Sequence, residues 1–177
     1  GPVWEGNQVW LILGGGAIFA AWPTLYAVSF SGFYFAMFLA LVALILRPVA
    51  FKFRSKRECP KWRATWDAAL VVGGLVPALI FGVAVGNVLL GVPFRFDDSL
   101  RIFYDGGLLG LLNPFALVTG VLSVLMLAVH GALWLGLKAS GPVRARAGVL
   151  ALWMMPLAIV LFIALGVVVH GWLPGYV

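Results

Sequence analysis

Long runs of apolar residues, separated by short polar gaps, set the pattern of this 177-residue chain. A helix needs about 20 apolar residues to cross the roughly 30 Å hydrocarbon core of a membrane, since each residue rises about 1.5 Å. Five segments reach that length, so the pattern predicts an all-α, polytopic transmembrane helix bundle that forms a single domain over residues 1–177. The expected helices are 7–28, 32–49, 66–90, 114–137 and 147–173.

Polar residues with helix-capping chemistry precede three of these segments. Asn7 and Thr65 are expected to cap the first and third helices. Asn113 is followed by Pro114, which suits the first helical position because its missing N–H would have no partner there. A tight turn over 29–32 is expected to join the first two helices.

The composition indicates a lipid environment and excludes both a soluble domain and a nucleic-acid-binding protein. Hydrophobic residues make up 63% of the chain and charged residues only 10%, with a mean hydropathy of +1.08, whereas a soluble domain carries about 25% charged residues. The net charge of +6 does not indicate nucleic-acid binding, because the basic residues sit in short gaps between apolar runs. The single cysteine, Cys59, cannot form an internal disulfide.

The charges of the gaps predict an orientation. The gap between the second and third helices contains Arg47, Lys52, Arg54, Lys56, Arg57, Lys61 and Arg63, and the gap between the fourth and fifth contains Lys138, Arg144 and Arg146. The gap between the third and fourth helices contains Arg95 and Arg101 with Asp97, Asp98 and Asp105. Because positive loops stay in the cytoplasm, the first two gaps are expected inside, and the third gap and the C-terminus outside. Binding of anionic lipid by the basic gaps is compatible with this orientation.

Small residues predict close helix packing. Gly74, Ala78, Gly82 and Gly86 recur every four residues along the third helix, so they share one face on which another helix backbone can approach closely. The run 14–16 consists of glycine, and each buried helical glycine costs about 1 kcal/mol in helix propensity. Close contact with another helix is expected to offset this cost at 14–16. The alternatives are a hinge at these glycines or a cofactor that packs against them.

Two histidines raise the question of haem binding. On the predicted helices, His130 lies roughly 10 Å from the inner end and His170 near the outer surface, too far apart in depth to hold one iron. His130 paired with Met154 or Met155 would give His/Met ligation, although a lone intramembrane histidine more often makes an interhelical hydrogen bond. The sequence contains no nucleophile triad, phosphate loop or zinc spacing, so catalysis by this chain alone is poorly supported.

Glu5, one of six acidic residues, stands at the start of an apolar run beside Asn7 and Gln8. One interpretation is an acid stabilised by the positive end of a helix dipole. The other is a proton relay at the cytoplasmic mouth of a proton path, where the two amides hold water beside a partly desolvated carboxyl group. The residues alone favour neither interpretation.

Several long motifs resemble subunit II of the cytochrome bd quinol oxidases. They are GPVWEGNQVWLILGGGAIFAAWP, FSGFYFAMFLALVALILRPVAFKFRSK, WDAALVVGG, GVAVGNVLLGVPF and LLNPFALVTG. The resemblance covers nearly the whole chain and weakens after about Arg146. It implies that this sequence corresponds to the second to sixth helices of the family member and is a piece of a longer protein.

The resemblance carries specific expectations. The family oxidises quinol and reduces dioxygen to water in bacterial and archaeal cytoplasmic membranes. Its haems b and d are held by the homologous subunit I, against which subunit II packs, so no haem, metal or catalytic residue is expected in this chain. The acid of the family's W-[DE]-G-N motif falls on Glu5, which implies a role in cytoplasmic proton supply. No quinol oxidation site is assigned to this chain, although a quinone or lipid tail could fill a groove on its surface.

Two other function classes remain as alternatives. A small secondary transporter or channel would require broken helices around a polar site at mid-membrane, usually in paired repeats, and no motif occurs twice in this chain. A haem-binding membrane cytochrome would use His130 with a methionine. The interpretation favoured by the sequence is a structural and proton-delivering subunit without redox ligands of its own.

Overall fold

The computed structural model describes residues 2–98, 101–106 and 110–172, apart from the side chains of 2–5, 8, 102 and 172. Its elements are α1 (Pro2–Ala21), α2 (Pro23–Gly32), α3 (Tyr34–Phe53), the 3-10 helix η1 (Arg54–Lys56), α4 (Pro60–Leu90), β1 (Phe94–Phe96), β2 (Ile102–Tyr104), α5 (Pro114–Lys138) and α6 (Pro142–Trp172). In the described residues, four segments are long and apolar enough to cross a membrane: Tyr34–Lys56, Pro60–Leu90, Pro114–Lys138 and Pro142–Gly171. The predicted polytopic helical membrane fold is confirmed.

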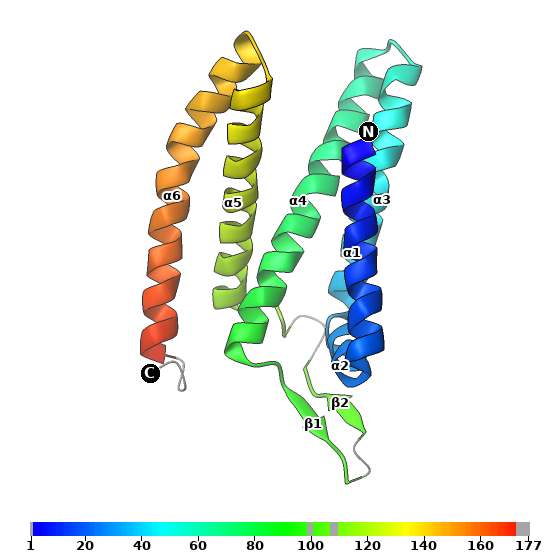
Figure 1. Cartoon of the computed structure of the whole chain (residues 1–177), viewed down its shortest axis with the longest axis vertical. Helices are drawn as coiled ribbons and strands as arrows, with labels where there is room; N and C mark the ends of the chain where they lie inside the picture. The colour runs from blue at the N-terminus through cyan, green and yellow to red at the C-terminus, as the bar shows by residue number, and fades with distance from the viewer. Residues whose placement is uncertain (1, 99–100, 107–109, 173–177) are drawn as a thin grey trace.

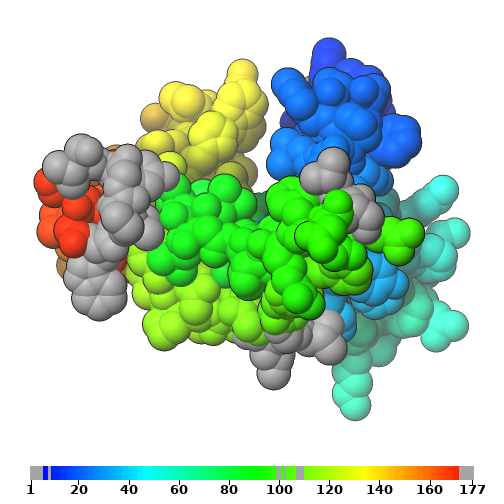
Figure 2. Space-filling view, turned by 90° about the horizontal axis from the view of Figure 1, so that it is seen from below, coloured from blue at the N-terminus to red at the C-terminus, as the bar shows by residue number. Residues whose placement is uncertain are grey.

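The four long helices stand in a row, each packed against the next in the order α3, α4, α5, α6 (Figure 1). The N-terminal helices lie to one side of this row, as the view from below shows (Figure 2). Within the described residues the buried apolar positions are mostly alanines, and most large apolar side chains face outward. In lipid such a surface needs no polar cover, because the acyl chains are as apolar as the side chains.

The first predicted helix, 7–28, is divided in the structure. α1 ends at Ala21, and α2 begins at Pro23 after Trp22, whose φ of −136° and ψ of 71° leave the helical region. A residue before proline is pushed away from the α region by the pyrrolidine ring. The single helix expected over 7–28 is therefore corrected to two helices, α1 of 20 residues and α2 of 10 residues.

Glycines hold α4 and α5 at close range. A Cβ atom added at Gly82 would lie 2.6 Å from Cβ of Ser123 and 2.7 Å from Cα of Gly120. Thr119 donates a hydrogen bond from Oγ1 to the Gly82 carbonyl across the seam at 3.0 Å. At Gly86 an added Cβ would meet Thr119 as well as the α5 backbone. Only a residue without a side chain fits either position.

The predicted small-residue stripe does not meet α5 along its whole length. Ala78, Gly82 and Gly86 are buried, but Gly74 is exposed, and a Cβ atom added there meets nothing within 4 Å. Its neighbour Gly73 faces the opposite helix, where an added Cβ would lie 2.8 Å from the Ala43 carbonyl of α3. Within the described residues no other helix therefore packs against Gly74, unlike the rest of the predicted stripe.

A pair of asparagines joins the end of α4 to the start of α5. Asn87 is 5% exposed and donates from Nδ2 to the carbonyls of Val83 and Leu111, at 2.8 and 2.7 Å. Asn113 donates from Nδ2 to Oδ1 of Asn87 at 2.9 Å, and its own Oδ1 accepts from the Ala116 amide at 2.7 Å. Buried amides need such partners, because an unpaired polar group in an apolar environment is costly.

This arrangement confirms Asn113 as the N-cap of α5 with Pro114 in the first turn. The other two predicted caps are wrong, because their helices begin earlier. Asn7 lies inside α1. Thr65 lies inside α4, which begins at Pro60, and its hydroxyl donates to the Lys61 carbonyl at 3.0 Å.

The gap between α4 and α5 folds into a hairpin. β1 and β2 pair antiparallel with Phe94 opposite Tyr104 and Arg95 opposite Phe103. Arg95 forms an ion pair with Asp105 at 2.9 Å. The hairpin lies at the end of the row opposite the α3–α4 and α5–α6 turns (Figure 1), so the two basic turns share one end.

Gly82→Leu should weaken the seam between α4 and α5, because the new side chain meets α5 backbone that cannot move aside. We expect a loss of about 1–3 kcal/mol in stability, measured as a lower thermal unfolding temperature in detergent. Gly74→Leu is the matched control, since its side chain enters open space. Equal losses from the two variants would contradict this account of the seam.

Asn87→Ala should also destabilise the chain, because it leaves the Leu111 carbonyl and the Asn113 amide without their partner. The expected loss is about 1–3 kcal/mol, again read from thermal unfolding. Thr65→Ala, an exposed polar position on the same helix, serves as the comparison and should change little. An unchanged unfolding temperature for Asn87→Ala would show that the asparagine pair does not hold the two helices together.

Candidate functional site

Glu5, Asn7 and Gln8 lie on the first turns of α1. Positions 5 and 8 are three residues apart and share one face of the helix, whereas position 7 lies on another side. The side chain of Asn7 is exposed, and those of Glu5 and Gln8 lie outside the described residues. The backbone therefore groups Glu5 with Gln8 and separates Asn7 from them.

α1 has an open surface around its glycines. A Cβ atom added at Gly14, Gly15 or Gly16 meets nothing within 4 Å. Trp10 and Ile12 are 70% and 73% exposed. The expected close contact at the triple glycine is therefore wrong for the described part of the chain, in which α1 packs mainly against α2.

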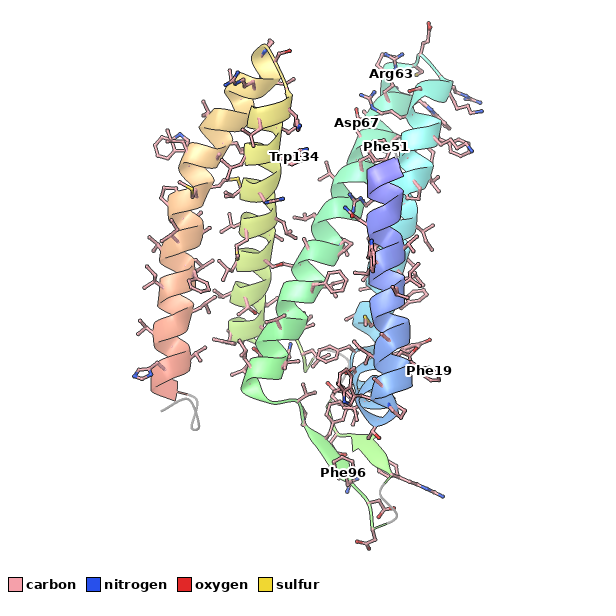
Figure 3. The ribbon with its side chains drawn as sticks, in the orientation of Figure 1. Phe19, Phe51, Arg63, Asp67, Phe96 and Trp134 are labelled. Carbon is pink, nitrogen blue, oxygen red and sulfur yellow. The ribbon has the colours of Figure 1, made fainter. Side chains whose placement is uncertain are left out.

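The turn between α3 and α4 is ordered by charge and aromatic contacts. Arg54 pairs with both carboxylate oxygens of Asp67, and Trp62 donates from Nε1 to the Phe53 carbonyl at 2.8 Å. The Phe53 ring stacks on Trp66 with centroids 5.6 Å apart. Asp67 and Arg63 appear at this end in Figure 3. Since the Arg54–Asp67 pair is half exposed, its role is to fix the turn rather than to add much stability.

A large apolar cavity of about 810 Å³ lies toward the other end, among the end of α1, α2, α3, α4 and the hairpin. Phe19 and Tyr26 line one side, and Leu79 and Val83 of α4 line another. Tyr104 also lines it, and its hydroxyl is buried without a hydrogen-bond partner. Burial raises the pKa of the Tyr104 phenol above its usual value, so this group stays protonated at neutral pH. The cavity is suited to an apolar occupant.

The histidines do not form a haem site with other described residues. His130 is exposed on α5, and His170 is exposed near the far end of α6. Among the residues that the structure describes, no three of His, Cys, Asp or Glu gather as a metal-binding group. Neither histidine is enclosed within the part of the chain that the structure describes.

Sequence reasoning missed the hairpin, the asparagine pair and the cavity. The hairpin had a signal in the paired aromatic runs FRF and IFY, at 94–96 and 102–104, which are typical of short strands. Asn87 stood out as an amide in an apolar helix, and such a residue requires a partner. No pattern in the sequence indicates the cavity, because it arises from the break at Pro23 and from the position of α2 beside α3.

Comparison with known proteins places the chain in a family. The family model described as cytochrome bd terminal oxidase subunit II matches residues 1–176. The chain is 48% identical to cytochrome bd-I ubiquinol oxidase subunit 2 of Escherichia coli over 176 residues, which cover 99% of the chain and 46% of that protein.

Two further relatives agree. The chain is 58% identical to a probable cytochrome oxidase subunit 2 of Haemophilus influenzae, over 82% of the chain and 39% of that protein. It is 34% identical to cytochrome bd ubiquinol oxidase subunit 2 of Bacillus subtilis, over 93% of the chain and 47% of that protein. The chain thus spans less than half the length of these relatives. On the family match across nearly every residue, the chain belongs to the cytochrome bd terminal oxidase subunit II family.

Proposed function

We propose that this chain acts as subunit II of a membrane quinol oxidase, packs against a haem-bearing subunit I and helps to supply protons for the reduction of dioxygen to water. The family match over residues 1–176 carries the proposal. Relatives at 34% and 48% identity are named as subunits of ubiquinol oxidases. A secondary transporter or channel is not favoured, because no such name occurs among these relatives.

The proposed orientation places the two basic turns in the cytoplasm of a bacterial or archaeal cell. Both turns lie at one end of the helix row, and the acidic hairpin lies at the other (Figure 1). α1 begins toward the basic end, so Glu5 belongs to the cytoplasmic half. Since positive loops remain inside, the arrangement of the turns supports proton entry from the cytoplasm.

Glu5 is the proposed proton carrier. A carboxyl group takes up and releases a proton, whereas a carboxamide does neither, so Gln8 on the same helix face would hold water rather than carry the charge. Asn7 lies on another side of α1 and is assigned a minor part. The open surface of α1, with Trp10 exposed, leaves room for a second subunit to complete the path.

Haems b and d are assigned to the partner subunit, where they would pass electrons from quinol to dioxygen. This assignment rests on the family match and on the resemblance, which implies that subunit I holds both haems. The competing idea, a haem held here by His130 with Met154 or Met155, has no support from the described geometry. Quinol oxidation is likewise assigned to the partner.

Glu5→Gln in the assembled enzyme should slow quinol-driven oxygen consumption by about 10²-fold, a typical cost of losing one proton-transfer group. Haem content should stay normal, because the variant keeps the shape of the side chain. The measurement is oxygen uptake per haem across a range of pH.

The matched control is Glu58→Gln, which removes an exposed carboxyl group in the turn at the same end of the molecule. It should leave turnover unchanged. If Glu5→Gln also turned over at the normal rate at every pH, Glu5 would serve only to stabilise the start of α1.

A further inference from the structure

We propose that Arg47 is the cationic partner of Glu5, a positioning residue that holds the Glu5 carboxylate at the cytoplasmic entry of the proton route. This inference rests on the proposed function of Glu5. Three observations carry it: the place of Arg47 inside a membrane-spanning helix, the space that α4 leaves for its side chain, and its depth relative to Glu5.

Arg47 is a cation within a membrane-spanning segment. It belongs to Tyr34–Lys56 and stands six residues before α3 ends at Phe53. Ala43 and Ala50, one turn to either side, are 3% and 0% exposed, so Arg47 lies on the buried side of α3. Charged residues within a span are rare, face other helices or a water-filled cavity, and mark ion or proton pathways. Further chain or a second subunit would only bury this side chain more.

Gly73 of α4 makes room for the arginine side chain. A Cβ atom added at Gly73 would lie 2.5 Å from Cγ of Arg47, 3.4 Å from its Cδ and 2.8 Å from the Ala43 carbonyl oxygen. The stem of Arg47 therefore packs in the α3–α4 seam against bare backbone. The Arg54–Asp67 pair closes the same seam, six to seven residues or about 9 to 10 Å nearer the turn. Arg47 thus adds a second, deeper layer of charge.

The acids of the sequence leave one candidate for this layer. Three of the six belong to the hairpin region at the opposite end of the molecule (Figure 1): Asp97, Asp98 and Asp105. Glu58 lies in the α3–α4 turn, beyond the end of α3. Asp67 is engaged by Arg54 through both carboxylate oxygens. The sixth acid is Glu5.

Glu5 and Arg47 lie at similar depth. Phe19 of α1 lines the apolar cavity together with Phe35 and Leu39 of α3, which brings the two helices to one level there. Glu5 precedes Phe19 by 14 residues, roughly 21 Å of helix. Arg47 follows Phe35 and Leu39 by 12 and 8 residues, roughly 18 and 12 Å. Since α1 begins toward the basic end and α3 ends there (Figure 1), both positions lie on the same side of the cavity, and a long arginine side chain spans the remaining difference in depth.

The two residues divide the chemistry between them. The Glu5 carboxylate accepts a proton from cytoplasmic water and, as the carboxyl group, releases it toward the partner subunit. Arg47 keeps its own proton throughout, because a guanidinium is not deprotonated in proteins. It acts on Glu5 by charge and by its planar set of donors, which fix a carboxylate in one orientation. A neighbouring cation also favours the charged form of a carboxyl group, so Glu5 stays ready to accept the next proton.

A cross-linking test measures proximity in the assembled enzyme without reading activity. In a Cys59→Ser background, Glu5→Cys with Arg47→Cys should be joined by a short, membrane-permeant bismaleimide, as detected by mass spectrometry. Glu5→Cys with Ile45→Cys is the matched control, because position 45 is two residues away and lies on the opposite side of α3. A cross-link of equal yield in the control, or none in either pair, would overturn the proposal.

A turnover test separates the charge of Arg47 from its packing. Arg47→Met keeps an apolar stem against Gly73 and should lower kcat about tenfold, short of the roughly 10²-fold cost of a misplaced reacting group. The KM for quinol and the haem content should not change. Arg47→Lys keeps the charge and should recover most of kcat. In a Glu5→Gln background, Arg47→Met should cause little further loss, because residues that act as one unit are not additive.

The outcomes distinguish this inference from the proposed function. If Glu5→Gln slows turnover and Arg47→Met does not, the proposed function stands and the inference fails. If Glu5→Gln turns over normally, the proton role of both residues fails, whatever the cross-link shows. Losses that multiply in the double variant would show that Arg47 acts independently of Glu5. Equal loss of haem content in Arg47→Met and Arg47→Lys would show that Arg47 serves only assembly.

Discussion

Close approach of helix backbones is the constraint on which this structure depends. Lipid surrounds the helices with a medium as apolar as their own side chains, so burial of leucine or phenylalanine does little to join them. What remains is close packing and hydrogen bonding between helices. Gly82 and Gly86 let α5 approach α4 until Thr119 reaches the Gly82 carbonyl, and the Asn87–Asn113 pair closes the same seam at one end. The row of helices follows from these contacts.

The same constraint leaves large apolar side chains exposed on the outer faces of the helices, where they are available to other parts of a membrane complex. Helices packed side by side bury mainly alanine and glycine, so large side chains such as Trp10 and Trp153 are exposed. The proposed packing against a haem-bearing neighbour would use such surfaces. The proton carrier proposed at Glu5 stands on α1, the helix with the most open surroundings, while the two basic turns mark the end from which protons would enter.

The sequence was a good guide to the four long helices and to one of the three predicted helix caps. Lipid thickness fixed the four long helices, and Asn113 with Pro114 capped α5 as expected. The sequence was a poor guide where contacts between neighbouring segments determine the structure. Pro23 interrupts a run that hydropathy alone reads as continuous, and Gly74 and Gly82 look alike in sequence although only one meets α5.

The most direct test of the account is the optical spectrum of the complex recovered through an affinity tag on this chain. The account predicts that the reduced-minus-oxidised spectrum shows haems b and d, and that on dissociation all haem follows a second polypeptide identified by mass spectrometry. Recovery of the chain without haem, or haem that stays with this chain after the second polypeptide is removed, would contradict it.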